Sequence, residues 1–190
     1  MRLTLICHGA TSATRAAAFP IDEPIEATSV ARAEKLGRAL GRVDRAWTSP
    51  ALRARQTAAA LGLAAEMAPA LRDCDYGCWS GRTFADLERT QPADLALWLS
   101  DVDAVPHGGE SVSALVERVS AWLDEVGSGR GYVVAVTHAS VVRAAIARVV
   151  AAPTSSFWRV DVAPLSVSRL GRHAGGWTLR LAGGFETEPK

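Results

Sequence analysis

Short apolar runs alternate along the chain with longer segments in which apolar residues recur every three or four positions. The run LTLI (residues 3–6) predicts a short buried strand. The run YVVAVTH (residues 132–138) predicts the strongest strand, because a continuous apolar run is typical of strands buried on both faces. Weaker strand patterns cover residues 42–49, 66–68, 165–170 and 177–182.

Helical spacing predicts further segments between these strands. Pro50 fits the first turn of one helix, and Pro92 divides another segment into two short helices. The helical patterns cover residues 27–40, 51–63, 84–101, 107–129 and 140–150, and residues 71–83 predict a turn-rich aromatic loop. Strands that alternate with helices indicate an α/β fold with a mostly parallel central sheet. Since no repeat or linker divides the chain, we expect one three-layer α/β/α domain over residues 1–190.

Composition narrows the class of protein further. Hydrophobic residues make up 48% and charged residues 22% of the 190 positions, which is typical of a folded globular chain. The net charge of +1 gives no electrostatic reason to expect a nucleic-acid or membrane partner. No apolar segment is long enough to span a bilayer, and the N-terminus begins directly with a strand pattern. Three cysteines do not make a disulfide framework, so we expect a cytoplasmic protein, with no indication of its oligomeric state.

Three side chains with affinity for phosphate follow predicted strands. His8 ends the first strand, His138 ends the strongest strand, and Arg53 lies in the first turn of the helix after residues 42–49. Ligands of such sheets bind beyond the carboxyl ends of the strands. A single histidine there is better explained as a partner of local backbone groups, but two histidines with an arginine indicate a phosphate site.

Six stretches in the same order resemble motifs of the histidine phosphatase superfamily, the phosphoglycerate mutase-like proteins. LICHGATSAT is similar to the strand-R-H-G-x-T signature, and TSPALRARQTA to S-x-x-x-R-A-x-Q-T-A. The remaining four stretches are DEPIEATSVARAEKLG, LRDCDYGCWSG, PHGGES and VVAVTHASVVR. Each stretch alone is weak, whereas six in order over nearly the whole chain are specific. The resemblance implies a phosphoglycerate mutase-like fold.

The resemblance also implies catalytic roles. His8 would attack phosphorus as a neutral imidazole and form a phosphohistidine, while His138 and Arg53 would stabilise the transferring group. Asp73 stands where the family commonly has the glutamate that acts as general acid, and Glu110 is the next candidate. Alternatively, Asp73 only caps its loop. Substrate-binding positions implied are Cys7, Gly9, Thr11, Thr14, Arg15 and Arg53, with no metal and no cofactor.

Cys7 departs from the family because an arginine normally precedes the nucleophilic histidine. Loss of one preorganised donor to transition-state charge costs on the order of 10² to 10³ in rate. Cys7 is not expected to be the nucleophile, because cysteine phosphatases need C-x5-R and the next arginine here is Arg15, which gives C-x7-R. We expect Cys7 to be a small buried residue, and Arg15 could replace the missing charge.

Two further patterns favour packing over chemistry. Cys74 and Cys78 form C-x3-C without a second matched pair, which is poor spacing for zinc. Trp98 and Trp122 lie at helical spacing among apolar residues, so we expect them in the core.

The sequence therefore predicts a phosphatase that acts on a small phosphorylated metabolite, such as α-ribazole phosphate or a broad range of phosphomonoesters. The rival prediction is a weakened or inactive family member that binds phosphorylated ligands. A phosphoglycerate mutase is the lesser alternative, because 190 residues leave little room for the insertions of mutases.

Overall fold

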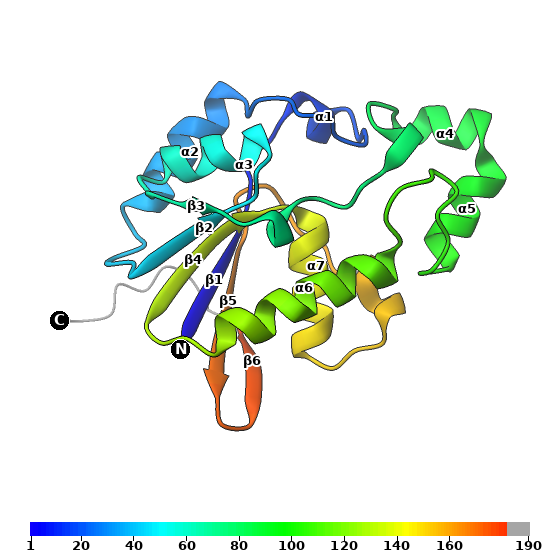
Figure 1. The fold of residues 1–190 in the computed structure, drawn as a ribbon. Coiled ribbons are helices and arrows are strands. Elements are labelled where there is room, and N and C mark those ends of the chain that lie inside the picture. Colours follow the sequence, from blue (N-terminus) through cyan, green and yellow to red (C-terminus); the bar gives the residue numbers. More distant parts are fainter. Residues whose placement is uncertain (182–190) are drawn as a thin grey trace.

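Six strands form one mixed sheet in the computed structural model, which describes residues 1–181 (Figure 1). The strand order is β3-β2-β4-β1-β5-β6. The strands are β1 (Arg2–Cys7), β2 (Arg45–Thr48), β3 (Glu66–Met67), β4 (Tyr132–Thr137), β5 (Val167–His173) and β6 (Gly176–Arg180). The first four strands are parallel, and β5 and β6 form an antiparallel hairpin beside β1. The predicted mostly parallel sheet is confirmed.

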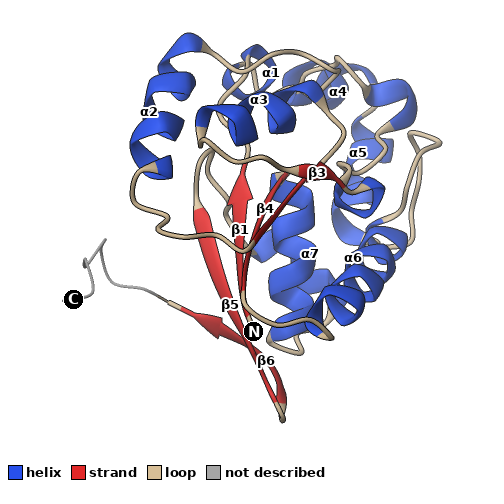
Figure 2. Ribbon diagram, turned by 60° about the vertical axis from the view of Figure 1, so that its left-hand side comes forward, coloured by secondary structure: helices blue, strands red, loops and turns tan. Residues whose placement is uncertain are grey.

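Helices cover both faces of this sheet, as predicted (Figure 2). On one face, α2 (Ala27–Gly37) and α3 (Leu52–Ala60) pack against Ile6, Val134 and Val136. On the other face, α6 (Val112–Gly127) and α7 (Ala139–Val149) pack against Leu3, Leu5 and Val133. Because successive strand residues point to opposite faces, a strand between two helical layers must be apolar throughout.

The helix ends follow local chemistry. Ser111 caps α6 by accepting the amide proton of Ala114, so this helix begins after the predicted residue 107. Pro92 occupies the first turn of α5 (Pro92–Ser100) and separates it from α4 (Phe84–Thr90), which confirms the predicted break. Both Trp98 and Trp122 are buried as expected.

Several short elements carry too little periodicity for prediction. They are α1 (Ser12–Arg15) and the 3₁₀ segments η1 (Pro69–Leu71), η2 (Gly77–Trp79) and η3 (Thr154–Arg159). Strand β2 begins later than predicted, because the Asp44 carboxylate accepts the Tyr132 amide proton at the start of the ladder. The strand predicted at 177–182 extends to Ala182, which lies outside the described residues, as do residues 183–190 of the predicted domain.

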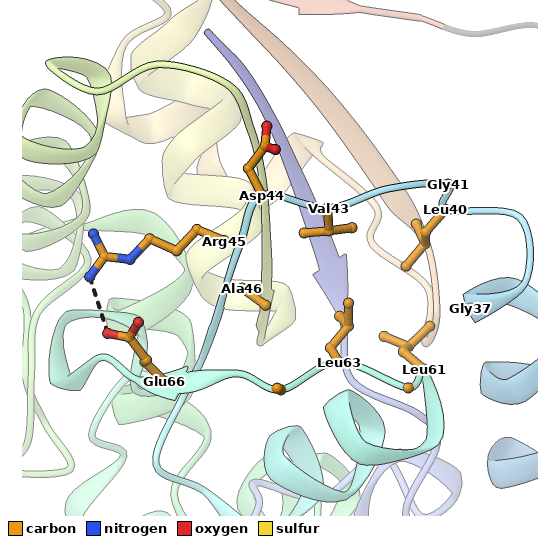
Figure 3. A pocket seen from close by; sticks show the side chains of 12 residues that line it. Gly37, Leu40, Gly41, Val43, Asp44, Arg45, Ala46, Leu61, Leu63 and Glu66 are labelled. Atoms are coloured by element: carbon orange, nitrogen blue, oxygen red, sulfur yellow. Dashed lines mark hydrogen bonds and ion pairs between the residues drawn. The ribbon is translucent and has the colours of Figure 1, made fainter.

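A cavity of about 410 Å³ opens at the amino-terminal end of β2 (Figure 3). Its walls include Asp44, Arg45 and Glu66, and an ion pair joins Arg45 to Glu66. The predicted phosphate-binding residues follow the carboxyl ends of the strands, so this cavity lies at the other end of the sheet. Over residues 1–181, no helix combines the length and apolar character needed to cross a membrane.

Candidate active site

Parallel pairing of the two central strands brings the two histidines together. Cys7 lies opposite Thr137 in the ladder between β1 and β4, so His8 and His138 leave the sheet at the same level. Their ring centroids are 5.2 Å apart, with 65° between the ring planes. His8 is 9% exposed and His138 is fully buried.

The orientation of His8 is fixed by the residue that follows it. Its Nδ1 lies 2.7 Å from the Gly9 carbonyl oxygen and donates to it, so Nε2 carries the free lone pair. Burial, followed by the neighbouring His138, lowers the pKa of His8 from 6.5 to about 4, although the bond to Gly9 opposes this shift. His8 is therefore a neutral base above about pH 5.

Gly9 joins the end of β1 to the helix that carries Arg53. Its amide donates to the Thr57 hydroxyl at 2.9 Å, and that hydroxyl donates to the Arg53 carbonyl at 2.7 Å. A side chain at position 9 would place Cβ only 2.7 Å from Cβ of Ser29, so glycine is required by close packing. Thr11 caps α1 and exchanges hydrogen bonds with Thr14.

Arg53, in the first turn of α3, is only 3% exposed. One terminal nitrogen donates to the Ile21 carbonyl at 2.7 Å, and the other donates to Asp73 Oδ2 at 2.7 Å. The buried Nε has no hydrogen-bond partner among the described residues. The guanidinium is therefore held in one orientation but keeps donor capacity for an anion.

Asp73 contacts both of the phosphate-binding side chains that the sequence predicts, Arg53 and His138. Its Oδ2 lies 2.7 Å from Arg53 and 3.2 Å from Nδ1 of His138, while Oδ1 accepts from the Ser140 hydroxyl at 2.5 Å. Burial by itself favours the neutral acid. The charge and hydrogen bond of His138, together with Arg53 and Ser140, nevertheless hold the pKa of Asp73 well below its usual range.

This cluster of His8, Arg53, Asp73 and His138 coincides with a family match over most of the chain. Residues 3–183 match the model of the histidine phosphatase superfamily (branch 1). The chain belongs to this superfamily.

Several relatives of this chain, and several similar solved structures, are named as phosphatases. The adenosylcobalamin/α-ribazole phosphatase of Salmonella typhimurium is 30% identical over 173 residues, which cover 85% of this chain and 86% of the relative. The crystal structure of the α-ribazole phosphatase from Shigella flexneri superposes with a TM-score of 0.87, at 25% identity and full coverage of both chains. A mycobacterial glucosyl-3-phosphoglycerate phosphatase complexed with VO₃ shares the fold, with a TM-score of 0.85, 24% identity, and coverage of 95% of this chain and 97% of that one.

Glu110, the second candidate for the general acid, lies in a separate network of this histidine phosphatase-like fold. Arg118 donates to both of its carboxylate oxygens, at 2.8 and 2.6 Å, and Arg72 approaches at 3.3 Å. The same Arg118 guanidinium donates to the backbone carbonyls of Ala70, Arg72 and Asp73. These contacts show how Glu110 and Arg118 fix the loop that presents Asp73.

Cys7 and Arg15 do not meet in the structure. Cys7 is 2% exposed, and its pKa is raised to about 12, mainly by burial, so the thiol is neutral and poorly nucleophilic. The Arg15 side chain is 73% exposed and forms a two-bond ion pair with Glu26, with its Nε 2.8 Å from Oε1. To replace the missing arginine, Arg15 would have to leave Glu26.

Two site residues were missed by sequence reasoning. Ser49 directly follows β2 and its hydroxyl lies 2.7 Å from Nε2 of His138, while Ser140 lies in the first turn of α7 and bonds Asp73. Both lie within three residues of a strand end, so a scan of every polar residue there would have found them. As for metals, residues 1–181 contain no group of three His, Cys, Asp or Glu side chains placed to hold an ion.

Because the pKa of His8 is lower in the folded than in the unfolded chain, we expect the free energy of unfolding to depend on pH. The unfolded chain binds a proton to this residue at about pH 6.5, whereas the folded chain binds it only near pH 4. The unfolded state therefore binds more protons between these values, and the free energy of unfolding falls as pH falls, by roughly 3 kcal/mol in total. Urea denaturation at several pH values should show this loss in the wild type and not in His8→Asn. Parallel pH dependences in the two proteins would contradict it.

Proposed function

We propose that this chain hydrolyses a small phosphomonoester through a phosphohistidine on His8. The observation that carries the proposal is the state of His8, a buried, neutral imidazole with its lone pair on Nε2. Its ring centroid lies 5.2 Å from that of His138. Arg53 reaches this pair from α3 through its shared contact with Asp73. A nucleophile beside preorganised hydrogen-bond donors is the arrangement that phosphoryl transfer needs.

The proposed reaction has two displacements at phosphorus. Nε2 of His8 forms the N–P bond while the bond to the leaving oxygen breaks, and Asp73 supplies the proton for that oxygen. Arg53 and His138 stabilise the charge on the equatorial oxygens. Water then attacks phosphorus and gives one proton to the Asp73 carboxylate, the N–P bond breaks with its electron pair returned to His8, and phosphate leaves. No step requires a metal or a cofactor.

The relatives support α-ribazole phosphate as one candidate substrate. The Salmonella relative is named for it, and the chain spans most of that protein. A wider range of phosphomonoesters is the other candidate, since a structural relative is named for glucosyl-3-phosphoglycerate. We propose a cytoplasmic location, and mutase activity remains the lesser alternative.

A second candidate function is phosphoryl binding without turnover. It is favoured by Cys7 at the position of the family's arginine and by the ion pair that holds Arg15 at Glu26. This candidate predicts phosphate affinity without a covalent intermediate.

Trapping of the phosphoenzyme separates the two functions. Wild-type protein mixed with an aryl phosphate and quenched should carry an acid-labile phosphoryl group on His8. His8→Ala should carry none, whereas His173→Ala, which changes an exposed histidine of β5, should be labelled like the wild type. If neither the wild type nor His8→Ala is labelled, and neither turns over any member of a substrate panel, the enzymatic function is refuted.

Cys7→Arg is expected to raise kcat/KM. Restoring one charged donor to the transition state contributes on the order of a 10²-fold gain. Cys7 ends β1 and directly precedes His8, so a longer side chain at this position starts beside the nucleophile. Turnover of an aryl phosphate by a variant with a native circular dichroism spectrum is the measurement. A folded variant without any gain would show that the pocket no longer accommodates this donor.

A further inference from the structure

One carboxylate oxygen of Asp73 contacts the two side chains that would bind a phosphoryl group. Oδ2 lies 2.7 Å from the Arg53 guanidinium and 3.2 Å from Nδ1 of His138. These are the two side chains assigned above to the oxygens of the transferring group. In the free protein, therefore, a carboxylate oxygen lies where a phosphate oxygen has to bind.

The other oxygen of Asp73 is tethered by neutral donors. Oδ1 accepts from the Ser140 hydroxyl at 2.5 Å and from the Cys74 amide at 2.9 Å. The backbone carbonyl of Asp73 is also held, by Arg118. Because of these tethers, an arriving anion can take the contacts of Oδ2 without expelling the carboxyl group from the site.

Two anions in such a buried space cannot both keep their charge. Like charges at hydrogen-bond distance raise the pKa of one partner strongly. The titratable and charged groups that face Asp73 are His8, Arg53, His138, Cys7, Cys74, Tyr76 and Arg118, which donates to its backbone carbonyl. His8, Cys7, Cys74 and Tyr76 are already neutral, since burial opposes the charged form of each.

We propose that, in the free protein, Oδ2 of Asp73 occupies the position of a phosphoryl oxygen. A phosphoryl group that binds there displaces Oδ2, and Asp73 then takes up one proton on Oδ2. This inference rests on the proposed function and deepens it. The proton comes from solvent and no covalent bond changes in this step. Ser140 and the Cys74 amide act as positioning groups, because they reserve Oδ1 and leave Oδ2 to be protonated.

Two properties of Asp73 conflict in the free protein. An ionised carboxylate cannot act as a general acid, yet Asp73 stands where the family's acid stands. Substrate binding itself would cause Asp73 to take up the proton that it then donates to the leaving oxygen. Phosphate affinity should therefore decrease as pH rises.

Titration calorimetry with inorganic phosphate tests the inference. Binding heats at about pH 8, measured in two buffers of different ionisation enthalpy, give the protons taken up per phosphate bound. Wild type should take up about one proton more than Asp73→Asn, because phosphate's own titration contributes equally to both proteins. Asp73→Asn should also bind phosphate about tenfold more tightly, since its competing anion is gone. Asp103→Asn, which changes an exposed aspartate, should behave as wild type.

The outcomes distinguish this inference from the proposed function. Equal proton uptake in wild type and Asp73→Asn, or weaker phosphate binding by Asp73→Asn, overturns the inference even where His8 is labelled. No phosphate binding by either protein overturns both. If Asp73→Asn does not fold, infrared difference spectra of wild type with and without phosphate decide, because a protonated carboxyl has its own carbonyl stretch. Its absence overturns the inference.

Discussion

Replacement of His8 with alanine is expected to lower kcat/KM by at least about 10⁴-fold. The imidazole is the nucleophile of the proposed reaction, and no second nucleophile lies ready beside it, because burial keeps the Cys7 thiol protonated. Water would have to attack the ester directly. Steady-state turnover of an aryl phosphate gives the rate, and labelling after an alkaline denaturing quench gives the phosphoenzyme.

The pH profile of the wild type adds a second check on His8. Since its pKa is about 4, the fraction of neutral nucleophile should stay constant from neutral pH down to about pH 5. A rate that falls with an apparent pKa near 6.5 would show a solvated, unperturbed histidine instead. Residual activity in His8→Ala within tenfold of wild type would rule out the phosphohistidine route.

Replacement of Arg53 with methionine is expected to lower kcat by about 10²- to 10³-fold. The guanidinium donates to both the Ile21 carbonyl and Asp73, and methionine keeps much of the side-chain volume but no donor. Arg53→Lys should restore little of the rate, because one ammonium cannot reproduce two donors in a planar fork. Arg55→Met, on the exposed side of α3, is the matched control and should keep wild-type kcat.

Stability has to be measured beside this rate. Removing one partner of a buried ion pair costs about 3–5 kcal/mol, because the Asp73 carboxylate loses its nearest cation. Activity is therefore compared at a temperature where urea denaturation shows both variants folded. A folded Arg53→Met with wild-type kcat would remove Arg53 from the catalytic groups.

Local pattern was sufficient for most of the fold. A strand between two helical layers has to be apolar on both faces, so β4 could be located from its residues alone. Pro92 ended one helix and began the next because its ring fixes φ and removes an amide donor. The short α1 and η3 could not be predicted, since four to six residues carry no helical period.

The residues of the active site, too, could be predicted only in part. His8, Arg53 and His138 could be proposed from the sequence because parallel strands end at one edge of the sheet, and their chemistry suits phosphate. Register between β1 and β4 then placed the two histidines side by side. Ser49 and Ser140 were not predicted, because serine is common near helix starts and only its partner shows its role.

The amino-acid pattern was enough to establish the layered sheet, the order of strands and helices, and the family, because each depends on residue types at fixed spacings. Three-dimensional contacts between distant segments decided the state of each group. Burial beside His138 keeps His8 neutral, and Glu26 holds Arg15. Asp73 lies between Arg53 and His138, which come from different segments of the chain. Charge states depend on such neighbours and on exclusion of water, and neither is encoded in the spacing of residues along the chain.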